Sequence, residues 1–513
     1  MPHVSSALAR SLAHNLSRAD YTVAALTEAF GLSAVSALQQ GDAAPVRRSL
    51  CTIARHTAVA IRLFWLGDSC SREDVEEMLS PTHLEELLSG GIVSMAGPQV
   101  KALIAIRPYA YHDARGTGEW WIASDLDEIA GVAPLRTDHV LGVGGAGRTL
   151  AGLIPPLHVK HSLDMGCGCG ILSLHLHRFS DQVTATDISE RAVWFTNLTA
   201  ALNGIENINT RVGSLFEPVA GERFGLVASN PPFVVTPRAE GVPTYEYRDG
   251  GFAGDALMAE VLSGLESVLE EGGLAVLLGN WEERSDLSGV DRVVEWTGNL
   301  DSWVIEREHV DPVGYARLWA RDGGSHPGAD DYNTLVAAWL DDFDSRDVSG
   351  VGMGWVIARR STIPKTLGRT ERLSHQLPIQ TPGAHLLYAI NAHDELRDLA
   401  DDELAASLLM VNEDVTEARH HMPGAESPSV IELRQGGNFG RSIEVDPALA
   451  GFVGACDGEL SVGSIIGAIA HILEVDRAEL AADLLPRVRE LIFTGFLSLP
   501  SAPSSESEIG RLE

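Results

Sequence analysis

The tetrapeptide Asn230-Pro231-Pro232-Phe233, which follows a short apolar run, is the feature that most constrains this chain. The Asn230 side-chain oxygen and the Pro231 carbonyl are hydrogen-bond acceptors, and the Phe233 ring offers a face on which a flat substrate can stack. Two acceptors that hold one NH2 group orient its nitrogen lone pair toward an electrophile, which is catalysis by positioning. We therefore take Asn230, Pro231, Pro232 and Phe233 as the candidate catalytic residues.

A glycine-rich turn lies upstream, where residues 164–170 read Asp-Met-Gly-Cys-Gly-Cys-Gly between an apparent strand and an apparent helix. Glycine permits positive φ and a close approach of the backbone to a ligand. A second apparent strand ends at Asp187, about 20 residues on, where the ribose-binding acid of such sheets is expected. The turn alone is weak evidence. The turn, Asp187 and the Asn-Pro-Pro-Phe motif in this order predict a nucleotide-type cofactor site in an α/β sheet.

This combination resembles the class I S-adenosylmethionine-dependent methyltransferases of the Asn-Pro-Pro-Tyr/Phe group, over residues 150–360 or so. The resemblance implies a Rossmann-like seven-stranded α/β sheet and S-adenosylmethionine as cofactor. By the resemblance, Asp164, Gly166 and Gly168 contact the cofactor and Asp187 binds its ribose hydroxyls. The further candidate cofactor contacts are Thr149, which can instead cap a helix, and Cys167, Gly170, Ile188, Ser214, Leu215 and Asn230. Phe233 is the assigned stacking surface for the substrate. Tyr245, Tyr247 and Arg248 are candidate substrate contacts, and the alternative is that their glycine-flanked loop only packs over the active site.

The chain departs from this family at two points. The family often has an acid after the third strand, where this chain has Gly213-Ser214, and an aspartate in the fourth strand, where it has Gly225. Both departures affect the expected cofactor affinity rather than the motif that holds nitrogen. No metal is expected: Cys167 and Cys169 lie near two histidines, but their spacing matches no common zinc pattern.

At 513 residues the chain is expected to form about three domains. We expect an N-terminal winged-helix-like domain over residues 1–135, the methyltransferase domain over 136–361, a C-terminal winged-helix-like domain over 376–500 and a disordered tail over 501–513. The C-terminal domain is expected to begin with mixed strands and loops and to contain a last helix broken by Pro486. The aromatic residues between the last two strands of the sheet predict either a local core or a wall of the substrate pocket.

The formal net charge of −33 argues against binding a polyanion over the whole surface. A basic segment, Arg359 to Arg372, follows the last expected strand, and it is either the lining of a substrate entrance or a solvated linker. The five cysteines are scattered, and the sequence shows no membrane-spanning run and no signal peptide, so we expect a cytoplasmic protein.

Three functions remain open from the sequence. The first is N-methylation of an exocyclic base amine of RNA or DNA, which is slightly favoured because two flanking domains are available for recognition. The second is N-methylation of a protein glutamine side chain, which the loop Tyr247–Leu257 and the negative charge support. The third is a binding protein that keeps the cofactor fold without activity. The sequence does not give the oligomeric state.

Overall fold

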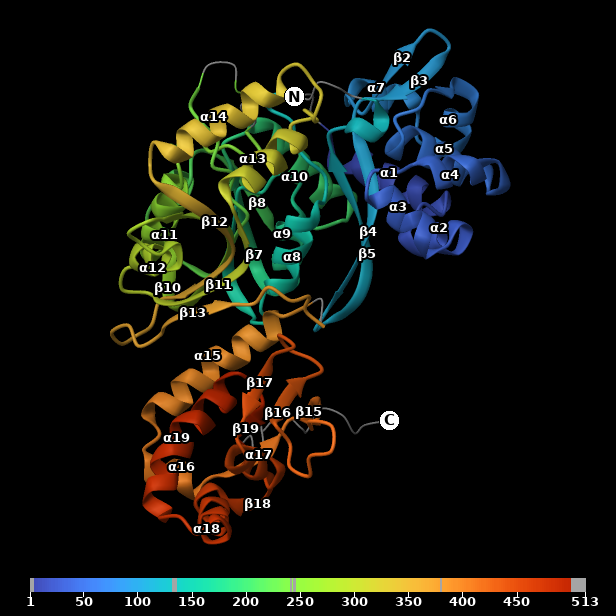
Figure 1. Ribbon diagram of the computed structural model, residues 1–513. Coiled ribbons are helices and arrows are strands. Elements are labelled where there is room, and N and C mark those ends of the chain that lie inside the picture. The colour runs from blue at the N-terminus through green and yellow to red at the C-terminus, as the bar shows by residue number, and fades with distance from the viewer. Residues whose placement is uncertain (1–3, 132–135, 240–241, 243–245, 379–380, 500–513) are drawn as a thin grey trace, which may run out of the picture. The chain divides into compact units, whose positions relative to one another are not determined.

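Eight strands form the largest sheet of the computed structural model (Figure 1). They are β6 (Val159–Met165), β7 (Ser180–Asp187), β8 (Ile208–Val212), β9 (Phe224–Ser229), β10 (Leu269–Arg284), β11 (Asp301–Val310), β12 (Val348–Arg359) and β13 (Gly368–Arg372). Their order across the sheet is β13-β11-β12-β10-β9-β6-β7-β8. Neighbouring strands from β8 to β10 are parallel, and β12 is antiparallel to both of its neighbours.

The prediction of an α/β protein with a mostly parallel sheet is confirmed. The predicted number of seven strands is wrong, because residues 368–372 add an eighth strand, β13, parallel to β11 at the edge of the sheet. Those residues belong to the basic segment that the sequence analysis left outside the sheet. Their alternating exposed and half-buried side chains are those of an edge strand, which can be short and charged.

The structure describes residues 4–131, 136–239, 242, 246–378 and 381–499. The chain divides into two units, residues 1–375, which contain the large sheet, and residues 376–513. The boundary expected at residues 135 and 136 falls within the first unit, so a separate N-terminal domain stays a prediction. The expected disordered tail, 501–513, lies outside the described residues.

Helices cover both faces of the sheet (Figure 1). One side carries α8 (Gly145–Leu153), α9 (Ile171–His177) and α10 (Glu190–Leu202), and the other carries α11 (Ala256–Val268) and α12 (Gly289–Trp296). Helices α13 (Pro312–Asp322) and α14 (Tyr332–Asp344) lie in the connection between β11 and β12. Sheets buried on both faces are typical of parallel α/β proteins.

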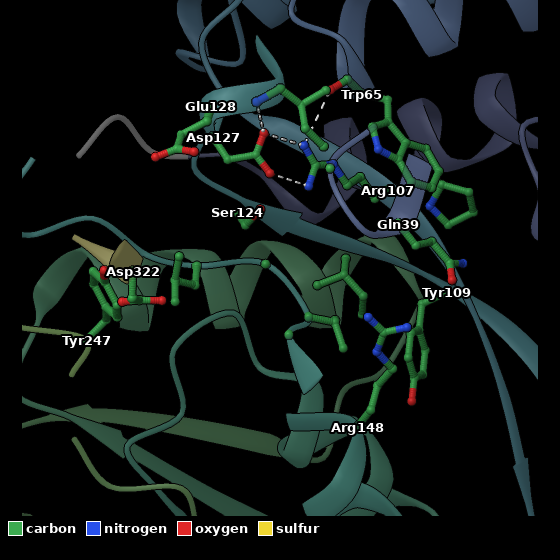
Figure 2. A pocket seen from close by; sticks show the side chains of 18 residues that line it. Gln39, Trp65, Arg107, Tyr109, Ser124, Asp127, Glu128, Arg148, Tyr247 and Asp322 are labelled. Carbon is green, nitrogen blue, oxygen red and sulfur yellow. Dashed lines mark hydrogen bonds and ion pairs between the residues drawn. The ribbon is translucent and has the colours of Figure 1, made fainter. Parts of the chain in front are cut away.

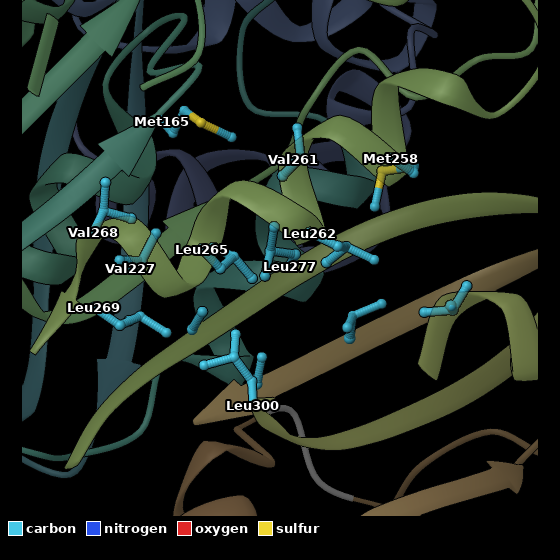
Figure 3. Close-up of a cluster of buried hydrophobic side chains, with 14 of the residues drawn as sticks. Met165, Val227, Met258, Val261, Leu262, Leu265, Val268, Leu269, Leu277 and Leu300 are labelled. Atoms are coloured by element: carbon cyan, nitrogen blue, oxygen red, sulfur yellow. The ribbon is translucent and has the colours of Figure 1, made fainter. Parts of the chain in front are cut away.

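The main core lies between the sheet and helix α11 (Figure 3). Helix α11 contributes Leu257, Val261 and Leu265, which recur every four residues and therefore share one face of the helix. Strand β10 contributes Ala275 and Leu277, two residues apart and so on the same face of the sheet. All five side chains are buried, which fixes the sheet on which the candidate site is built.

The N-terminal part of the first unit is helical and then forms two small sheets. Its helices are α1 (Ser6–Arg18), α2 (Val23–Phe30), α3 (Leu32–Gln39), α4 (Ala44–Ser49), α5 (Arg55–Ala60), α6 (Arg72–Leu79) and α7 (Leu84–Ser89). A three-stranded sheet contains β1 (Cys70–Ser71), β2 (Val93–Ala96) and β3 (Gln99–Ala102). A long hairpin, β4 (Ala105–Asp113) with β5 (Gly116–Ser124), follows.

This hairpin joins the N-terminal part to the large sheet through helix α10. The Trp121 backbone N–H donates to Asn203 Oδ1 at 3.0 Å, and the Asn203 amide donates back to the Trp121 carbonyl at 2.8 Å. The Ala123 N–H donates to Thr199 Oγ1 at 3.1 Å. Buried pairs of this kind hold two segments in register, so the hairpin forms a fixed wall beside the sheet.

The second unit begins with two helices, α15 (Gly383–Asp398) and α16 (Asp401–Ala406). The prediction of mixed strands and loops is wrong at this start, because Leu386, Ala389, Ile390 and Leu396 are buried at helical spacing on α15. The other elements are β14 (Leu408–Val411), β15 (Val415–His420), β16 (Val430–Gln435), β17 (Ser442–Val445), α17 (Pro447–Gly454), β18 (Asp457–Ser461), α18 (Val462–Leu473), α19 (Arg477–Phe493) and β19 (Leu497–Ser498).

The last helix, α19, runs through Pro486 as a single element, so the predicted break at this proline is wrong. Strands β14, β18 and β19 pair in one sheet and β15, β16 and β17 in another. Across the described ranges of both units, no helix combines the length and the apolar character needed to cross a membrane.

Candidate active site

Two loops meet at the carboxyl edge of the sheet where the strand order reverses. Met165, the last residue of β6, pairs with Ser229, the last residue of β9. The glycine-rich turn after β6 and the Asn-Pro-Pro-Phe segment after β9 therefore leave neighbouring strands at the same level. Ligands of open α/β sheets bind at such a reversal.

A cavity of about 450 Å³ lies at this edge. Its size is within the range of cofactor and small-molecule sites. The residues assigned to the site from the sequence that line this cavity are Gly166, Cys167, Gly168, Asp187, Ile188, Ser214, Leu215, Asn230, Pro231, Pro232 and Tyr247. The structure thus brings the glycine turn, the carboxylate and the amide to one cavity.

The other assigned residues that the structure describes do not line this cavity. Asp164 is buried beneath the turn, and Thr149 is exposed on α8. Gly170 touches α10, because a Cβ at this position would lie 3.1 Å from the Thr196 Cα. The Phe233 ring is half-buried against both hydrophobic clusters that adjoin the loop. Tyr245 lies outside the described residues.

Asp187 is held by backbone donors at the end of β7. The Gly168 N–H donates to its Oδ2 at 3.0 Å, and the Ser189 N–H donates to its Oδ1 at 2.9 Å. Burial raises the pKa of Asp187 above its ordinary value, and these N–H donors oppose the rise. Because each carboxylate oxygen keeps a further lone pair, the group can accept hydrogen bonds from a pair of ribose hydroxyls.

The glycine turn leaves open space for a ligand. Gly166 and Gly168 have φ of +79° and +52°, a region that suits glycine, and a Cβ at Gly168 would meet no atom within 4 Å. The apolar side chains of Ile188 and Leu215 also line the cavity. The open glycine backbone, these apolar side chains and the carboxylate of Asp187 together fit the adenosine and methionine parts of S-adenosylmethionine.

The Asn230 side chain keeps an unused hydrogen-bond acceptor, which a residue that holds an NH2 group needs. Its Oδ1 atom is buried and has no hydrogen-bond partner among the described residues. The neighbouring Pro231 carbonyl accepts the Phe233 N–H at 2.7 Å and retains a second lone pair. A buried acceptor without a partner costs on the order of 1–3 kcal/mol. An arriving N–H donor would recover this energy, so the site is complementary to such a donor.

Asp164 is a second acidic group under the turn. Its Oδ2 accepts the Ser173 hydroxyl, whereas its Oδ1 has no partner in the described parts of the chain. Burial, together with the nearby charge of Asp187, raises the pKa of Asp164 to about 7. Its ionisation is therefore sensitive to a positive charge brought into the cavity.

The loop after the Asn-Pro-Pro-Phe motif is held by the connection that contains α13 and α14. The Val235 N–H donates to the Tyr315 hydroxyl at 3.0 Å, and Trp339 Nε1 donates to the Val235 carbonyl at 2.8 Å. Asn280 on β10 also donates to the Tyr315 hydroxyl at 2.9 Å. The aromatic residues of this connection form a local core with Val234 and Val235.

The Arg248 side chain is buried and ion-paired, whereas binding of a substrate requires an accessible side chain. It is only 4% exposed, its guanidinium contacts Asp322 at 2.7 Å, and it lies 5.9 Å from the centre of the Trp319 ring. The Val234 N–H donates to the Arg248 carbonyl at 2.9 Å. These contacts support a role in fixing the loop, and the predicted substrate contact of Arg248 stays untested.

The basic segment from Arg359 to Arg372 lies at the opposite edge of the sheet. Arg359 pairs in register with Leu274, at the beginning of the parallel run of β10, and its guanidinium contacts Asp301 at 2.8 Å. Arg372 contacts Glu306 at 2.8 Å. None of the residues from Arg359 to Arg372 lines the cavity, because β13 is the edge strand of the sheet and three strands separate it from β9.

The segment before α8 covers one side of the cavity, and its side chains before residue 149 were not among those assigned to the site from the sequence. His139, Leu141 and Val143 line it, as does Glu246 from the loop near Tyr247. His139 is buried, its Nε2 has no partner among the described residues, and burial lowers its pKa. The local signal is the glycine density of residues 142–147, which fits a loop that closes over a cofactor. The place of His139 depends instead on how the hairpin packs against α10.

Comparison with known proteins agrees with this geometry. The family described as the methyltransferase small domain matches residues 143–242, and two families described as domains of unknown function match residues 18–103 and 391–499. Ribosomal RNA small subunit methyltransferase C of Alcanivorax borkumensis is 41% identical over 71 residues, which are 14% of this chain and 21% of that protein.

Release factor glutamine methyltransferase of Xylella fastidiosa is 32% identical over 131 residues, or 23% of this chain and 46% of that protein. The chain thus spans less than half of either relative. A solved structure of geranyl diphosphate C-methyltransferase from Streptomyces coelicolor has a TM-score of 0.27 at 14% identity, covering 42% of this chain and 77% of that one, which is too weak a likeness to support an argument. Residues 143–242 thus match the methyltransferase small domain, which supports the resemblance of this part of the chain to the S-adenosylmethionine-dependent methyltransferases of the Asn-Pro-Pro-Tyr/Phe group.

Proposed function

We propose that this protein transfers a methyl group from S-adenosylmethionine to a planar NH2 nitrogen of a macromolecule. The observation that carries the proposal is the buried Asn230 Oδ1, which has no partner among the described residues and lies in the wall of the cavity. The same cavity contains Asp187 and the glycine turn. A cofactor site and an acceptor for an N–H group therefore share one space.

The protein's part in the reaction is to bind, to orient and to exclude water. S-adenosylmethionine, when bound, supplies a methyl group activated by its sulfonium. Asn230 Oδ1 and the Pro231 carbonyl accept the two N–H groups, which favours the pyramidal nitrogen of the transition state over the flat one. The nitrogen–carbon bond forms as the sulfur–carbon bond breaks, and the nitrogen then loses one proton to solvent.

Among macromolecules we favour an exocyclic amine of RNA or DNA. The relative from Alcanivorax is named as a ribosomal RNA methyltransferase, and the first unit adds a large helical part to the catalytic sheet. A base in a duplex has to be unpaired or flipped out before its amine can reach a buried acceptor. The cytoplasmic location predicted from the sequence suits such a substrate.

A protein glutamine is the second candidate. The relative from Xylella is named as a release factor glutamine methyltransferase, and its match is the longer of the two. The net charge of −33 also disfavours a polyanion over most of the surface. A glutamine side chain presents the same planar NH2 group, so Asn230 and Pro231 serve both candidates.

The test combines substitution with identification of the labelled product. We expect Asn230→Ala to lower methyl transfer at least about a hundredfold, because an oriented acceptor is lost, while the affinity for S-adenosylmethionine stays within about threefold. Asn209→Ala, at an exposed position on β8, is the matched control. Transfer by Asn230→Ala at the wild-type rate would show that the amide has no catalytic role.

The substrate is identified with tritiated cofactor added to extract from cells that lack this gene, followed by digestion with nuclease or protease. Label released by nuclease supports the nucleic-acid substrate, and label released only by protease supports glutamine. If wild-type protein labels neither fraction although it binds the cofactor, the chain is a binding protein without this activity.

A further inference from the structure

The cavity of about 450 Å³ at the carboxyl edge of the sheet is called the cofactor cavity from here on. A second cavity, of about 620 Å³, adjoins it within the first unit. We call it the hairpin groove, because β4 and β5 form much of its wall, with α8 opposite (Figure 2). The two cavities share five lining residues: Leu141, Gly142, Val143, Gly144 and Tyr247. A polymer with one residue in the cofactor cavity would therefore place a neighbouring residue in the groove.

One wall of the hairpin groove is suited to an anion. Helix α8 begins at Gly145 without a side-chain cap, so its first N–H groups and the positive end of its dipole are available. A Cβ at Gly144 or Gly145 would meet no atom within 4 Å, so the backbone is open to a ligand. Arg148, in the first turn of α8, is exposed and lines the groove.

Arg148 differs from the other arginine that lines the groove. Arg107 makes two hydrogen bonds to Asp127, at 2.7 and 2.9 Å, and its charge is thereby compensated. Arg148 has no hydrogen bond or ion pair with any described residue, and Figure 2 shows its guanidinium next to the Tyr109 ring, away from Asp127 and Glu128. Asp322, a further acid of the lining, contacts Arg248. The free positive charge of the groove is therefore concentrated at α8.

The remaining lining of the groove adds the aromatic ring of Tyr109 and an unused donor, Trp65 Nε1. Trp65 is 2% exposed, yet its Nε1 has no hydrogen-bond partner in the described chain, which is a cost unless a ligand supplies an acceptor. Tyr109 is fixed by its hydroxyl, 3.2 Å from His175 Nε2, and by parallel packing against Trp120. Aromatic side chains held in this way are the stacking surfaces that single-stranded nucleic acids use.

We propose that the hairpin groove binds a nucleotide of single-stranded RNA or DNA next to the target base, with its phosphate at Arg148 and the start of α8, its base on the Tyr109 ring, and an acceptor atom of the nucleotide at Trp65 Nε1. The inference rests on the proposed function and names its substrate class. The chain as a whole carries a net charge of −33, so binding of an anion here depends on the local positive charge of Arg148 and the start of α8.

The test compares Arg148→Ala with Arg10→Ala, an exposed arginine of α1 that lines neither cavity. The probes are short single strands of RNA and of DNA with mixed sequence, labelled with a fluorophore. We expect Arg148→Ala to weaken binding about tenfold and to reduce the slope of log affinity against log salt by about 1, as for one lost phosphate contact. Arg10→Ala should bind as the wild type does, and both variants should keep wild-type affinity for S-adenosylmethionine.

Trp65→Phe tests the indole N–H donor, because it removes Nε1 and keeps an aromatic ring at this position. We expect it to weaken strand binding about threefold to tenfold through the lost indole donor, with an unchanged salt slope because no charge is removed. Unchanged strand affinity and salt slope in Arg148→Ala would overturn the inference. So would a wild-type protein that binds neither probe but methylates a glutamine peptide, and in that case methyl transfer to NH2 would stand. Loss of transfer in Asn230→Ala, with normal strand binding, separates the groove from the chemistry.

Discussion

Asp164 shows how one buried carboxyl couples the site to pH. Its pKa is raised to about 7, mainly by burial, so the folded chain keeps a proton that the unfolded chain loses near pH 4. Because the folded state binds more protons between about pH 4 and 7, the free energy of unfolding falls as pH rises through this window. Above about pH 7 the full cost of the buried charge is present.

We therefore expect Asp164→Asn to stabilise the cofactor-free protein by a few kcal/mol at about pH 8 and by much less at about pH 4, because the amide carries no charge. Denaturant unfolding at the two pH values measures this difference. Asp286→Asn, at an exposed position in the turn after β10, is the control. An equal change at both pH values would mean that Asp164 is ionised in the folded protein throughout this range.

At the scale of elements, the connection that carries α13 and α14 sets the position of the loop that follows the Asn-Pro-Pro-Phe motif. Tyr315 is fully buried, and its hydroxyl accepts from Val235 on the loop and from Asn280 on β10. The loop and the sheet are therefore linked through one oxygen atom. This link lies five residues after Asn230, close enough for its loss to change where the amide oxygen points.

We expect Tyr315→Phe to lower kcat about tenfold or more while the affinity for S-adenosylmethionine stays near the wild-type value, because a small displacement of a reacting group is costly. Two unsatisfied donors should also reduce the free energy of unfolding by roughly 2–5 kcal/mol. Tyr332→Phe is the matched control, since no described residue hydrogen-bonds its hydroxyl. If kcat and stability respond equally to both substitutions, the link does not position the loop.

At the scale of the whole molecule, both cavities are confined to the first unit. Every residue that lines the cofactor cavity lies between His139 and Leu257, and the hairpin groove is built from residues 39–322. The unit ends at residue 375, so the second unit supplies no described residue to either cavity. Binding of the cofactor should therefore be independent of it.

We expect a protein made of residues 1–375 to bind S-adenosylmethionine within about twofold of the full chain, because the cavity and its supporting core are complete within that unit. Titration calorimetry measures the affinity, and circular dichroism checks that the shortened protein is folded. A folded protein of residues 1–375 that does not bind the cofactor would assign a role in the site to the second unit.

Local residue patterns were enough to predict the parts of the site that depend on short stretches of chain. The glycine turn, Asp187 and the Asn-Pro-Pro-Phe segment each end a strand, and three such ends in one parallel sheet meet at one edge. Helix α6 was likewise predictable, because its cap is made by Ser71, which lies next to it and accepts the Asp74 N–H at 3.1 Å.

Only the tertiary structure decided what the long side chains do and which distant segments close the site. Arg248 contacts Asp322, 74 residues away, and Arg359 contacts Asp301, 58 residues away, so neither partner is visible in a local pattern. The same holds for the hairpin that places His139 and the groove beside the cofactor cavity. The physical reason is that a turn or a strand end depends on its immediate neighbours, whereas an arginine finds its carboxylate only after the layers between them have packed.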